Sequence, residues 1–343
     1  MSPCFKNWFK SFSAVFLILF LHFNARAQGS SLLPEANRIS GLPSNAVRCV
    51  ALDKEGRIWT GTDNGLSILN ANSISQKNII AKIGNTSIWG INFLDSLVFV
   101  GSRFDGLFVF NFYTGKLINQ FPSRAITLIR KIKVINGQVY ILSNNGAYKW
   151  GDNKIIKLKF TENIQDDFPT DMFYWQGALY ALSLRPFSLD FNVLKFNKNG
   201  FEEISTDKFF PIKNKKTILC AQTAGNILVI GGHGFYTILR DSLPPEMFTL
   251  PLNQKESFAV WDIAITKDNI LLALGENISG NKGCLYVHGK TILKKEALTQ
   301  CFITSFALDT ANKSLYYGSL TNGLYLQRAI NEILPINYQR KST

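Results

Sequence analysis

Residues 61–69 read Gly61-Thr62-Asp63-Asn64-Gly65-Leu66-Ser67-Ile68-Leu69, and the architecture of the chain follows from this short segment. Asn-Gly and Asp-Gly pairs supply the positive φ angles that a tight turn between antiparallel strands needs, at little steric cost. The apolar and β-branched residues on either side are typical of the strands that such a turn joins. The segment therefore predicts a β-hairpin.

Variants of this hairpin recur along the chain. Their turn glycines are Gly65, Gly106, Gly146, Gly234, Gly283 and Gly323. Successive glycines lie 40 to 49 residues apart, except for one interval of 88, which fits two units if a copy near residue 190 has lost its glycine. Four-stranded units at a period of about 40–50 residues are typical of β-propellers. The sequence thus predicts an all-β fold, a single seven-bladed β-propeller with four-stranded antiparallel blades, over residues 28–343.

The first 27 residues are expected to be a cleaved signal peptide. Lys6 and Lys10 precede an apolar run of 11 residues, and Ala25-Arg26-Ala27 fits cleavage after Ala27. Eleven residues span only about 16 Å as a helix, against about 30 Å of membrane hydrocarbon, although an uncleaved anchor helix is the alternative. We therefore expect an exported, periplasmic protein with no membrane span after cleavage.

The charge of the chain favours anionic partners. Removing residues 1–27, which carry three basic residues and no acidic one, lowers the formal net charge from +13 to +10. Such an excess attracts anions over long distances, but it also fits an ordinary lysine-rich surface. The basic residues are scattered and do not alternate with aromatic residues, so the sequence does not indicate nucleic-acid binding.

Few residues suit catalysis or metal binding. After residue 27 the only histidines are His233 and His288, and no catalytic or phosphate-binding motif occurs. The adjacent Asp166 and Asp167 are expected to lie in a solvated turn. A metal site needs several ligands that converge. We therefore expect no enzyme, no metal and no cofactor.

The cysteines are expected to be structural. Cys49 and Cys220 fall within predicted strands, where a cysteine usually acts as a small buried apolar residue. Cys284 and Cys301 could form a disulfide. No C-x-x-C arrangement occurs.

The first repeat shows its strands most clearly. Residues 47–52, 57–62, 66–69 and 78–83 are predicted to be its four strands, from the innermost to the outermost. Trp59 lies in the middle of the second strand and is predicted to pack between blades.

The two ends of the ring must also be joined, because an open ring leaves an exposed sheet edge. We expect residues 36–40 to supply the outer strand of the last blade, and residues 332–336 are the alternative.

Residues 41–70, GLPSNAVRCVALDKEGRIWTGTDNGLSILN, resemble the two-component regulator propeller repeat. The resemblance lies in the Gly-Leu-Pro-Ser-Asn turn, the acidic-x-x-Gly turn, the aromatic-x-Gly-Thr strand and the Asn-Gly hairpin. This family builds the extracytoplasmic sensor regions of bacterial hybrid two-component systems, which implies a sensor. Sensors of this family typically consist of two stacked propellers, followed by a β-sandwich, a membrane helix and a kinase. Residues 329–343 match none of these, so a stand-alone propeller and a fragment of a longer sensor both fit.

The rim of the central channel is the predicted ligand site. In a propeller the innermost strands line this channel, and aligning the repeats places equivalent residues at the start of each strand: Arg48, Trp89, Arg130, Thr170, Ile218, Trp261 and Thr304. Indole rings stack on the apolar faces of sugars, and guanidinium groups pair with carboxylate or sulfate. The predicted ligand-binding residues are therefore Arg48, Trp89, Arg130, Trp261 and Thr304. In the alternative interpretation the tryptophans pack between blades and the arginines only cap strand ends.

Two functions follow as hypotheses. The first is a non-catalytic, exported, sensor-type propeller that binds a ligand, such as an acidic oligosaccharide, and signals through a separately encoded kinase. The second is a protein-interaction scaffold at the cell envelope, with an envelope protein as its partner. An enzyme acting on polysaccharides ranks third, because histidine and paired carboxylates are lacking at the predicted rim.

Overall fold

The computed structural model describes residues 36–161, 164, 167–185, 190–207, 209–210, 217–250, 258–266, 269–276, 283–288 and 301–328. Residues Ala36–Thr343 form one structural unit and Met1–Glu35 another. The predicted signal peptide, residues 1–27, lies outside the described residues. Within the described part of the chain, no helix has the length and apolar character that a membrane crossing requires.

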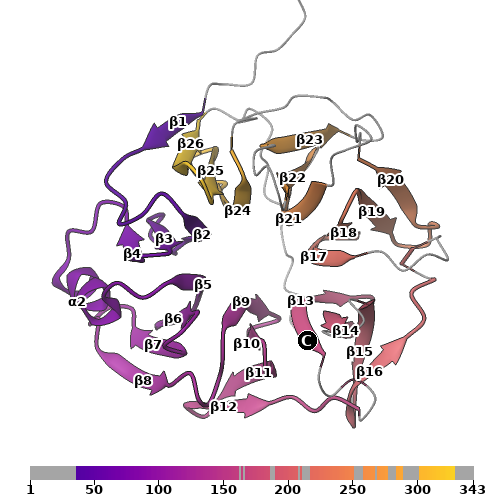
Figure 1. The fold of residues 1–343 in the computed structure, drawn as a ribbon, viewed down its shortest axis with the longest axis horizontal. Helices are drawn as coiled ribbons and strands as arrows, with labels where there is room; N and C mark the ends of the chain where they lie inside the picture. The colour runs from indigo at the N-terminus through magenta and orange to yellow at the C-terminus, as the bar shows by residue number, and fades with distance from the viewer. Residues whose placement is uncertain are drawn as a thin grey trace, which may run out of the picture. The chain divides into compact units, whose positions relative to one another are not determined.

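The described strands form seven antiparallel sheets (Figure 1). Five sheets have four strands each: β5–β8 (Ile88–Leu94, Leu97–Ser102, Leu107–Asn111, Leu117–Phe121); β9–β12 (Ile129–Ile135, Gln138–Ser143, Gly146–Gly151, Lys154–Lys157); β13–β16 (Phe168–Trp175, Ala178–Arg185, Asp190–Asn197, Gly200–Ile204); β17–β20 (Ile218–Ala224, Ile227–Gly232, Phe235–Arg240, Glu246–Thr249); and β24–β26 (Ile303–Asp309, Ser314–Ser319, Gly323–Gln327) with β1 (Asn37–Ile39). Two sheets have three strands each: β2–β4 (Val47–Leu52, Ile58–Thr62, Gly65–Ile68) and β21–β23 (Phe258–Ile265, Asn269–Glu276, Cys284–His288).

The innermost strands of these sheets close a circle. Along the chain, each of β2, β5, β9, β13, β17 and β21 contacts the next innermost strand, β21 contacts β24, and β24 contacts β2 again. In Figure 1 these strands surround the central axis, and the later strands of each sheet lie progressively outward. The sheets are therefore the blades of a β-propeller.

The predicted fold of seven uniformly four-stranded blades is wrong as stated. Among the described residues the β2–β4 and β21–β23 blades have three strands. In the first of these, residues 78–83 do not form the predicted outer strand but belong to helix α2 (Ile74–Ile83).

Local chemistry explains why this segment is helical. The Ser73 side chain accepts a hydrogen bond from the backbone N–H of Gln76, and the Gln76 side chain accepts one from the backbone N–H of Ser73, which completes a capping box. Ile79 and Ile83 lie four residues apart and are buried on one face, and the helix ends at Gly84, whose φ is 64°. The helical spacing of Ile79 and Ile83 is the signal that the strand interpretation overlooked.

The last blade takes its outer strand from the other end of the chain, as predicted. β1 pairs with β26 in antiparallel fashion, with Asn37 opposite Leu326 and Ile39 opposite Leu324. This pairing covers the edge of β26 and closes the ring. The alternative strand, residues 332–336, lies outside the described residues.

The hydrophobic core lies between neighbouring blades. Trp59 on β3 is fully buried, and its ring meets the edge of Phe93 on β5 at a centroid distance of 5.3 Å. Trp150 on β11 likewise meets Phe99 on β6 at 5.3 Å. The prediction that Trp59 packs between blades is confirmed.

Candidate functional site: the mouth of the central channel

Each innermost strand carries a β-bulge near its start. At that point the register against the second strand of the blade shifts, which leaves one residue without a partner in the ladder. These seven residues, which we call the mouth ring, are Arg48, Trp89, Arg130, Thr170, Leu219, Trp261 and Thr304. All seven line a cavity of about 680 Å³. The bulge therefore directs one side chain from every blade towards the channel.

The mouth ring contains every predicted ligand-binding residue. Arg48, Trp89, Arg130, Trp261 and Thr304 all lie in it, as does Thr170. Ligand binding by these residues stays a prediction.

The alignment is wrong at one place, where Leu219 and not Ile218 is the bulged residue. Leu219 lies 12 residues before Gly231 of β18, the same spacing as Trp89 before Gly101 of β6, so the aligned position Ile218 is one residue too early. Ile218 is buried in the core.

A second set of residues surrounds the mouth ring. In five blades, the hairpin between the second and third strands places a backbone N–H against a carbonyl just before the bulge, at 2.8 to 3.2 Å. These residues, which we call the turn ring, are Asp63, Arg103, Asn144, His233 and Leu320. The two rings bring residues about 15 positions apart in the sequence next to each other at one end of the channel.

Arg48 is neutralised by the turn ring. Its Nε and Nη2 donate to the two carboxylate oxygens of Asp63 at 2.8 and 2.7 Å. The Ser87 hydroxyl also donates to Asp63, at 2.8 Å. Burial alone would raise the pKa of Asp63, but the bonds from Arg48 and Ser87 outweigh it and hold that pKa below its usual value. The carboxyl group is therefore ionised at neutral pH.

Trp89 is in contact with two arginines of the site. The guanidinium carbon of Arg48 is 4.9 Å from the indole centroid, and that of Arg103 is 5.3 Å from it. The indole Nε1 donates to the Ser87 hydroxyl at 2.9 Å. The ring is thus fixed in orientation and half-buried at the edge of the cavity.

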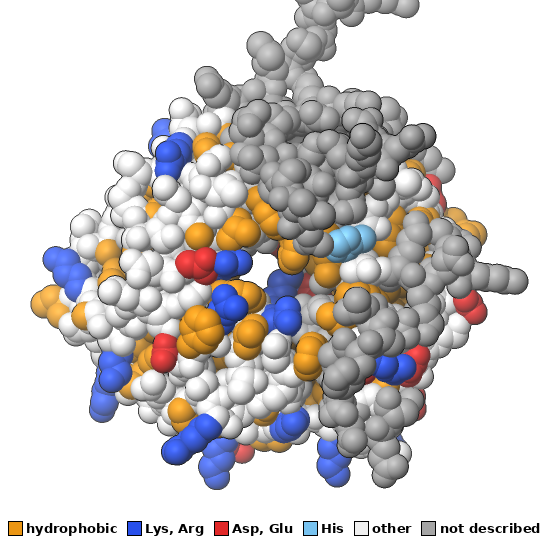
Figure 2. All heavy atoms as spheres, in the orientation of Figure 1, with side chains coloured by type: hydrophobic (Ala, Val, Ile, Leu, Met, Phe, Trp, Pro, Cys, Tyr) orange, Lys and Arg blue, Asp and Glu red, His pale blue; other side chains and the backbone are white. Residues whose placement is uncertain are grey.

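Two guanidinium groups of the mouth, those of Arg103 and Arg130, form no close ion pair among the described residues, although the charge of Arg103 also helps to lower the pKa of Asp63. Arg130 Nε donates to the amide oxygen of Asn144 at 2.6 Å, and burial lowers the pKa of Arg130. Arg103 makes its side-chain contacts with aromatic rings, and its buried Nε has no hydrogen-bond partner. Asp63 is the one acidic residue of the two rings, so the described mouth is cationic. Figure 2 shows Lys and Arg side chains gathered around the central opening.

Trp261 and Thr304 differ in what they can offer a ligand. The Trp261 ring lies 5.4 Å from that of Phe302, and its buried indole N–H has no hydrogen-bond partner. The Thr304 hydroxyl contacts the carbonyls of Val47 and Gly318 at 2.9 and 3.1 Å. In this structure Thr304 therefore joins the last blade to the first.

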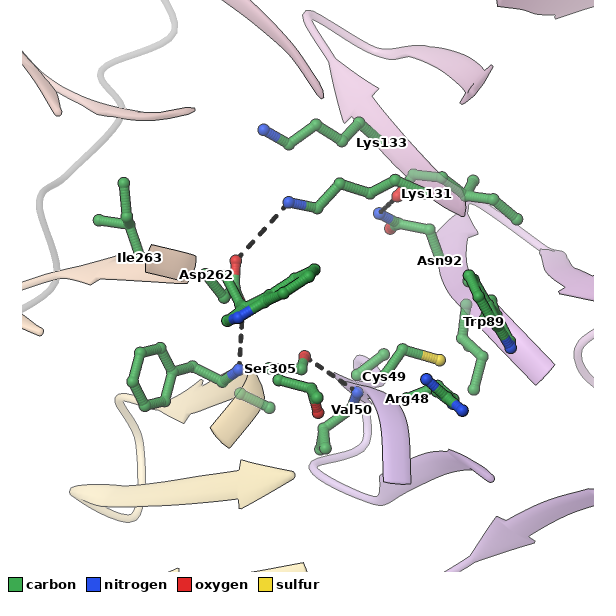
Figure 3. Close-up of a pocket in the computed structure, with 18 of the residues that line it drawn as sticks. Arg48, Cys49, Val50, Trp89, Asn92, Lys131, Lys133, Asp262, Ile263 and Ser305 are labelled. Carbon is green, nitrogen blue, oxygen red and sulfur yellow. Dashed lines mark hydrogen bonds and ion pairs between the residues drawn. The ribbon is translucent and has the colours of Figure 1, made fainter. Parts of the chain in front are cut away.

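Below the mouth, charged residues cross the channel. Lys131 and Lys133 extend from β9 into the lumen, towards Asp262 on β21 (Figure 3). Lys131 Nζ lies 2.8 Å from Asp171 and 3.7 Å from Asp262, and Lys133 Nζ lies 2.7 Å from Asp171. Burial would raise the pKa of Asp171, but the two lysines lower it below the usual value. This cluster holds three blades together.

The carboxylates of the channel also satisfy backbone groups. The inner edge of each innermost strand has no neighbouring strand, so its N–H groups need other acceptors. Asp171 accepts from the Ala221 N–H at 3.0 Å and Asp262 from the Phe306 N–H at 2.9 Å. The Ser305 hydroxyl accepts from the Val50 N–H at 3.1 Å. The residue after the bulge thus links one blade to the next.

Cysteines take part in the same contacts between blades. Cys220 is buried, and its thiol donates to the Val260 carbonyl at 3.3 Å. Burial raises the pKa of Cys49 to about 12, so this thiol is not ionised at neutral pH. Cys301 carries a free thiol. The side chain of Cys284, the other member of the disulfide that the sequence left open, lies outside the described residues.

Three features of the site escaped prediction. Arg103 belongs to a hairpin and not to an innermost strand, so aligning the inner strands could not find it. Its position two residues after Gly101, matching that of Asp63 two residues after Gly61, was the available signal. Lys131 and Asp171 directly follow predicted rim residues, but their pairing across blades depends on the closure of the ring.

No group of three or more His, Cys, Asp or Glu side chains in the described residues could hold a metal ion. Asp167, one of the adjacent pair, is buried and accepts hydrogen bonds from Ser183 and Asn192, whereas Asp166 lies outside the described residues. The expectation of a solvated turn is therefore wrong for Asp167.

The fold and its lined channel define a β-propeller, and the comparisons with known proteins agree. Residues 41–64 match the family model described as the two component regulator propeller, so the chain carries a repeat of that family. No curated protein sequence matches the chain.

Solved structures resemble this chain. One is the extracellular domain of the hybrid two component system BT4673 from B. thetaiotaomicron, with a TM-score of 0.64 and 16% identity over 86% of this chain and 40% of that one. Another is PorZ of Porphyromonas gingivalis, a surface component of the type-IX secretion system, with a TM-score of 0.61 and 15% identity over 84% of this chain and 47% of that one. The chain spans less than half the length of either protein. These likenesses establish the fold.

Proposed function

We propose that the chain is a non-catalytic, exported, sensor-type propeller whose channel mouth binds an acidic oligosaccharide. The proposal rests on one observation above all. Trp89 presents a fixed aromatic ring beside Arg103, and on the neighbouring blade Arg130 is a second guanidinium that forms no ion pair in the described structure. The cavity of about 680 Å³ below them is within the range that small-molecule sites occupy.

The residue types suit a sugar acid. An aromatic ring supplies a flat apolar surface for the C–H face of a pyranose, at a low cost in conformational entropy. A guanidinium group pairs with a carboxylate or sulfate through two parallel hydrogen bonds. The partly buried position of Arg130 strengthens such a pair, because water screens it less.

The same residues argue against catalysis. A general acid at neutral pH needs a carboxyl group with a raised pKa. At the mouth and in the channel, Asp63 and Asp171 have lowered pKa values, and Asp262 accepts a backbone N–H and lies beside Lys131. Burial lowers the pKa of His233, and its backbone N–H fastens a hairpin.

Isothermal titration tests the proposal. Residues 28–343 would be titrated with tetragalacturonate, a sulfated heparin tetrasaccharide and neutral cellotetraose. We expect at least one acidic glycan to bind, the neutral glycan not to bind, and the affinity to fall as salt is raised. Trp89→Ala and Arg130→Gln should each weaken binding about tenfold or more. Absence of binding by both acidic glycans, or unchanged binding by both variants, would contradict the proposal.

A scaffold at the cell envelope is a second candidate. Large apolar side chains are exposed away from the mouth ring, among them Ile74 on α2 and Leu243 before β20. A pull-down from envelope extract separates the two functions, because a scaffold retains a stoichiometric protein partner without any glycan. If the sensor acts through a separately encoded kinase, that kinase would also be recovered in this pull-down.

A further inference from the structure

We propose that Phe104 forms a second sugar-binding subsite on the rim, so that the ligand of the mouth spans at least two sugar residues. This inference rests on the proposed function, because it extends the same site. It gives a function to the hairpin between β6 and β7, whose sequence is explained neither by the repeat pattern nor by the lining of the channel.

The hairpin that carries Phe104 is longer than those of two other blades. Ser102 and Gly106 are separated by three residues, whereas Thr62 and Gly65, and likewise Ser143 and Gly146, are separated by two. The additional residue places a phenylalanine at the tip, and its side chain is 61% exposed. Single exposed apolar residues are common, so exposure alone would carry no argument.

The tip is held in place by its own hydrogen bonds. The Asp105 N–H donates to the Ser102 hydroxyl at 2.6 Å, and the Ser102 N–H donates to the Gly106 carbonyl at 2.9 Å. The Thr86 hydroxyl bonds to the Asp105 carboxylate, and the Arg103 N–H donates to the Ser87 carbonyl at 2.9 Å. An aromatic ring on a fastened loop loses little entropy when it binds a ligand.

One guanidinium group joins Phe104 to the mouth. The guanidinium carbon of Arg103 lies 4.8 Å from the Phe104 centroid and 5.3 Å from the Trp89 centroid. The centroids of the Phe104 and Trp89 rings therefore lie no farther apart than the sum of these two distances, and the Arg103 guanidinium contacts both rings. Two aromatic platforms with a charge between them suit neighbouring sugar residues that carry carboxylates.

The chain offers a matched control. Tyr113 is also 61% exposed and also stacks with a cation, since Lys54 Nζ lies 4.0 Å from its ring centroid. It lines a separate cavity with Lys54 and Asp95 and does not line the channel. Removing either ring removes a similar apolar surface, but only Phe104 adjoins the mouth.

The experiment compares ligands of increasing length. Wild type, Phe104→Ala, Phe104→Trp and Tyr113→Ala would be titrated with mono-, di- and tetragalacturonate, or with the matching heparin fragments if these are the binders. We expect affinity to rise from the monomer to the longer ligands. Phe104→Ala should weaken the longer ligands about tenfold and leave the monomer unchanged. Phe104→Trp should keep the wild-type affinity, as should Tyr113→Ala.

The two proposals fail in different ways. Equal affinity for the monomer and the longer ligands, with no effect of Phe104→Ala, would overturn the second subsite and leave the mouth site standing. An equal loss in Phe104→Ala and Tyr113→Ala would also overturn it. Absence of binding by every acidic sugar to wild type would overturn the proposed function itself. Thermal unfolding confirms that each variant is folded.

Discussion

The guanidinium of Arg48 and the carboxylate of Asp63 form a bidentate ion pair at 2.7 and 2.8 Å, which joins the mouth ring to the turn ring within one blade. The corresponding positions of the next two blades hold Trp89 with Arg103 and Arg130 with Asn144. The first blade therefore pairs its own arginine with a carboxylate, whereas the next two blades form no such ion pair in the described structure and Arg103 feels Asp63 only at longer range. This asymmetry concentrates positive charge on one side of the mouth.

Removing the charge of Asp63 should strengthen the binding of an acidic ligand. In Asp63→Asn, Arg48 keeps a hydrogen-bond partner of the same shape, but the local charge becomes more positive by one unit. We expect the affinity for an acidic oligosaccharide to rise about threefold to tenfold at low salt, measured by isothermal titration. Asp95→Asn, at a carboxylate outside the channel lining, is the control and should change nothing. A weaker affinity in Asp63→Asn would show that Asp63 positions Arg48 for the ligand.

Asp171 should contribute more to stability than Asp262. Its side chain is 0% exposed, and it faces Lys131, Lys133 and the Ala221 N–H. Asp171→Asn leaves two buried lysines without their main counter-charge, and we expect the free energy of unfolding to fall by about 3–5 kcal/mol in urea. Asp262→Asn should cost about 1 kcal/mol, because Asp262 is partly exposed and 3.7 Å from Lys131. Equal losses would contradict the central position of Asp171.

Stability should fall in acid, and Asp171 should account for part of the fall. Its folded pKa is lower than the ordinary value of 3.8, so its contribution is complete above the unfolded pKa and is lost as the pH falls through the folded pKa. Urea midpoints of wild type and Asp171→Asn should therefore differ most above about pH 5, and the difference should shrink only as the pH falls below about 4 towards the folded pKa. A difference between the two proteins that does not change over this range would exclude the ionised carboxylate as its cause.

Asp53 should be essential to the first blade. Its carboxylate accepts four hydrogen bonds at 2.8 to 3.0 Å, from the N–H groups of Glu55 and Arg57, from Arg57 Nε and from the indole of Trp59. Asp53→Ala should lower the free energy of unfolding by about 3 kcal/mol, since it leaves a buried indole N–H and a turn unsatisfied. Glu55→Ala, in the same turn but exposed, should cost less than about 1 kcal/mol. Similar losses in the two variants would contradict the role of Asp53.

The repeat pattern predicts the architecture because each blade is encoded locally. The hairpin glycines, the acidic turn that contains Asp53 and the strand that contains Trp59 are set by the neighbouring sequence. For the same reason the alignment finds Arg48, Trp89, Arg130, Trp261 and Thr304 as one set, since each lies at the same bulge.

Features that depend on contacts between blades could not be predicted in this way. The pairing of Lys131 with Asp171 and Asp262 requires three blades to face one channel. The replacement of the outer strand by α2 depends on a capping box at Ser73, whose signal competes with a run of β-branched residues.

The pairing of β1 with β26 has a consequence for the order in which the protein folds. Asn37 and its partner Leu326 lie 289 residues apart in the sequence, so the final blade cannot be assembled until the whole stretch from β1 to β26 has been synthesised. Closing so long a loop is entropically costly, and contacts of such high sequence separation form slowly. Until β1 and β26 pair, a strand edge stays open, and unpaired strand edges are prone to pair with other chains and aggregate.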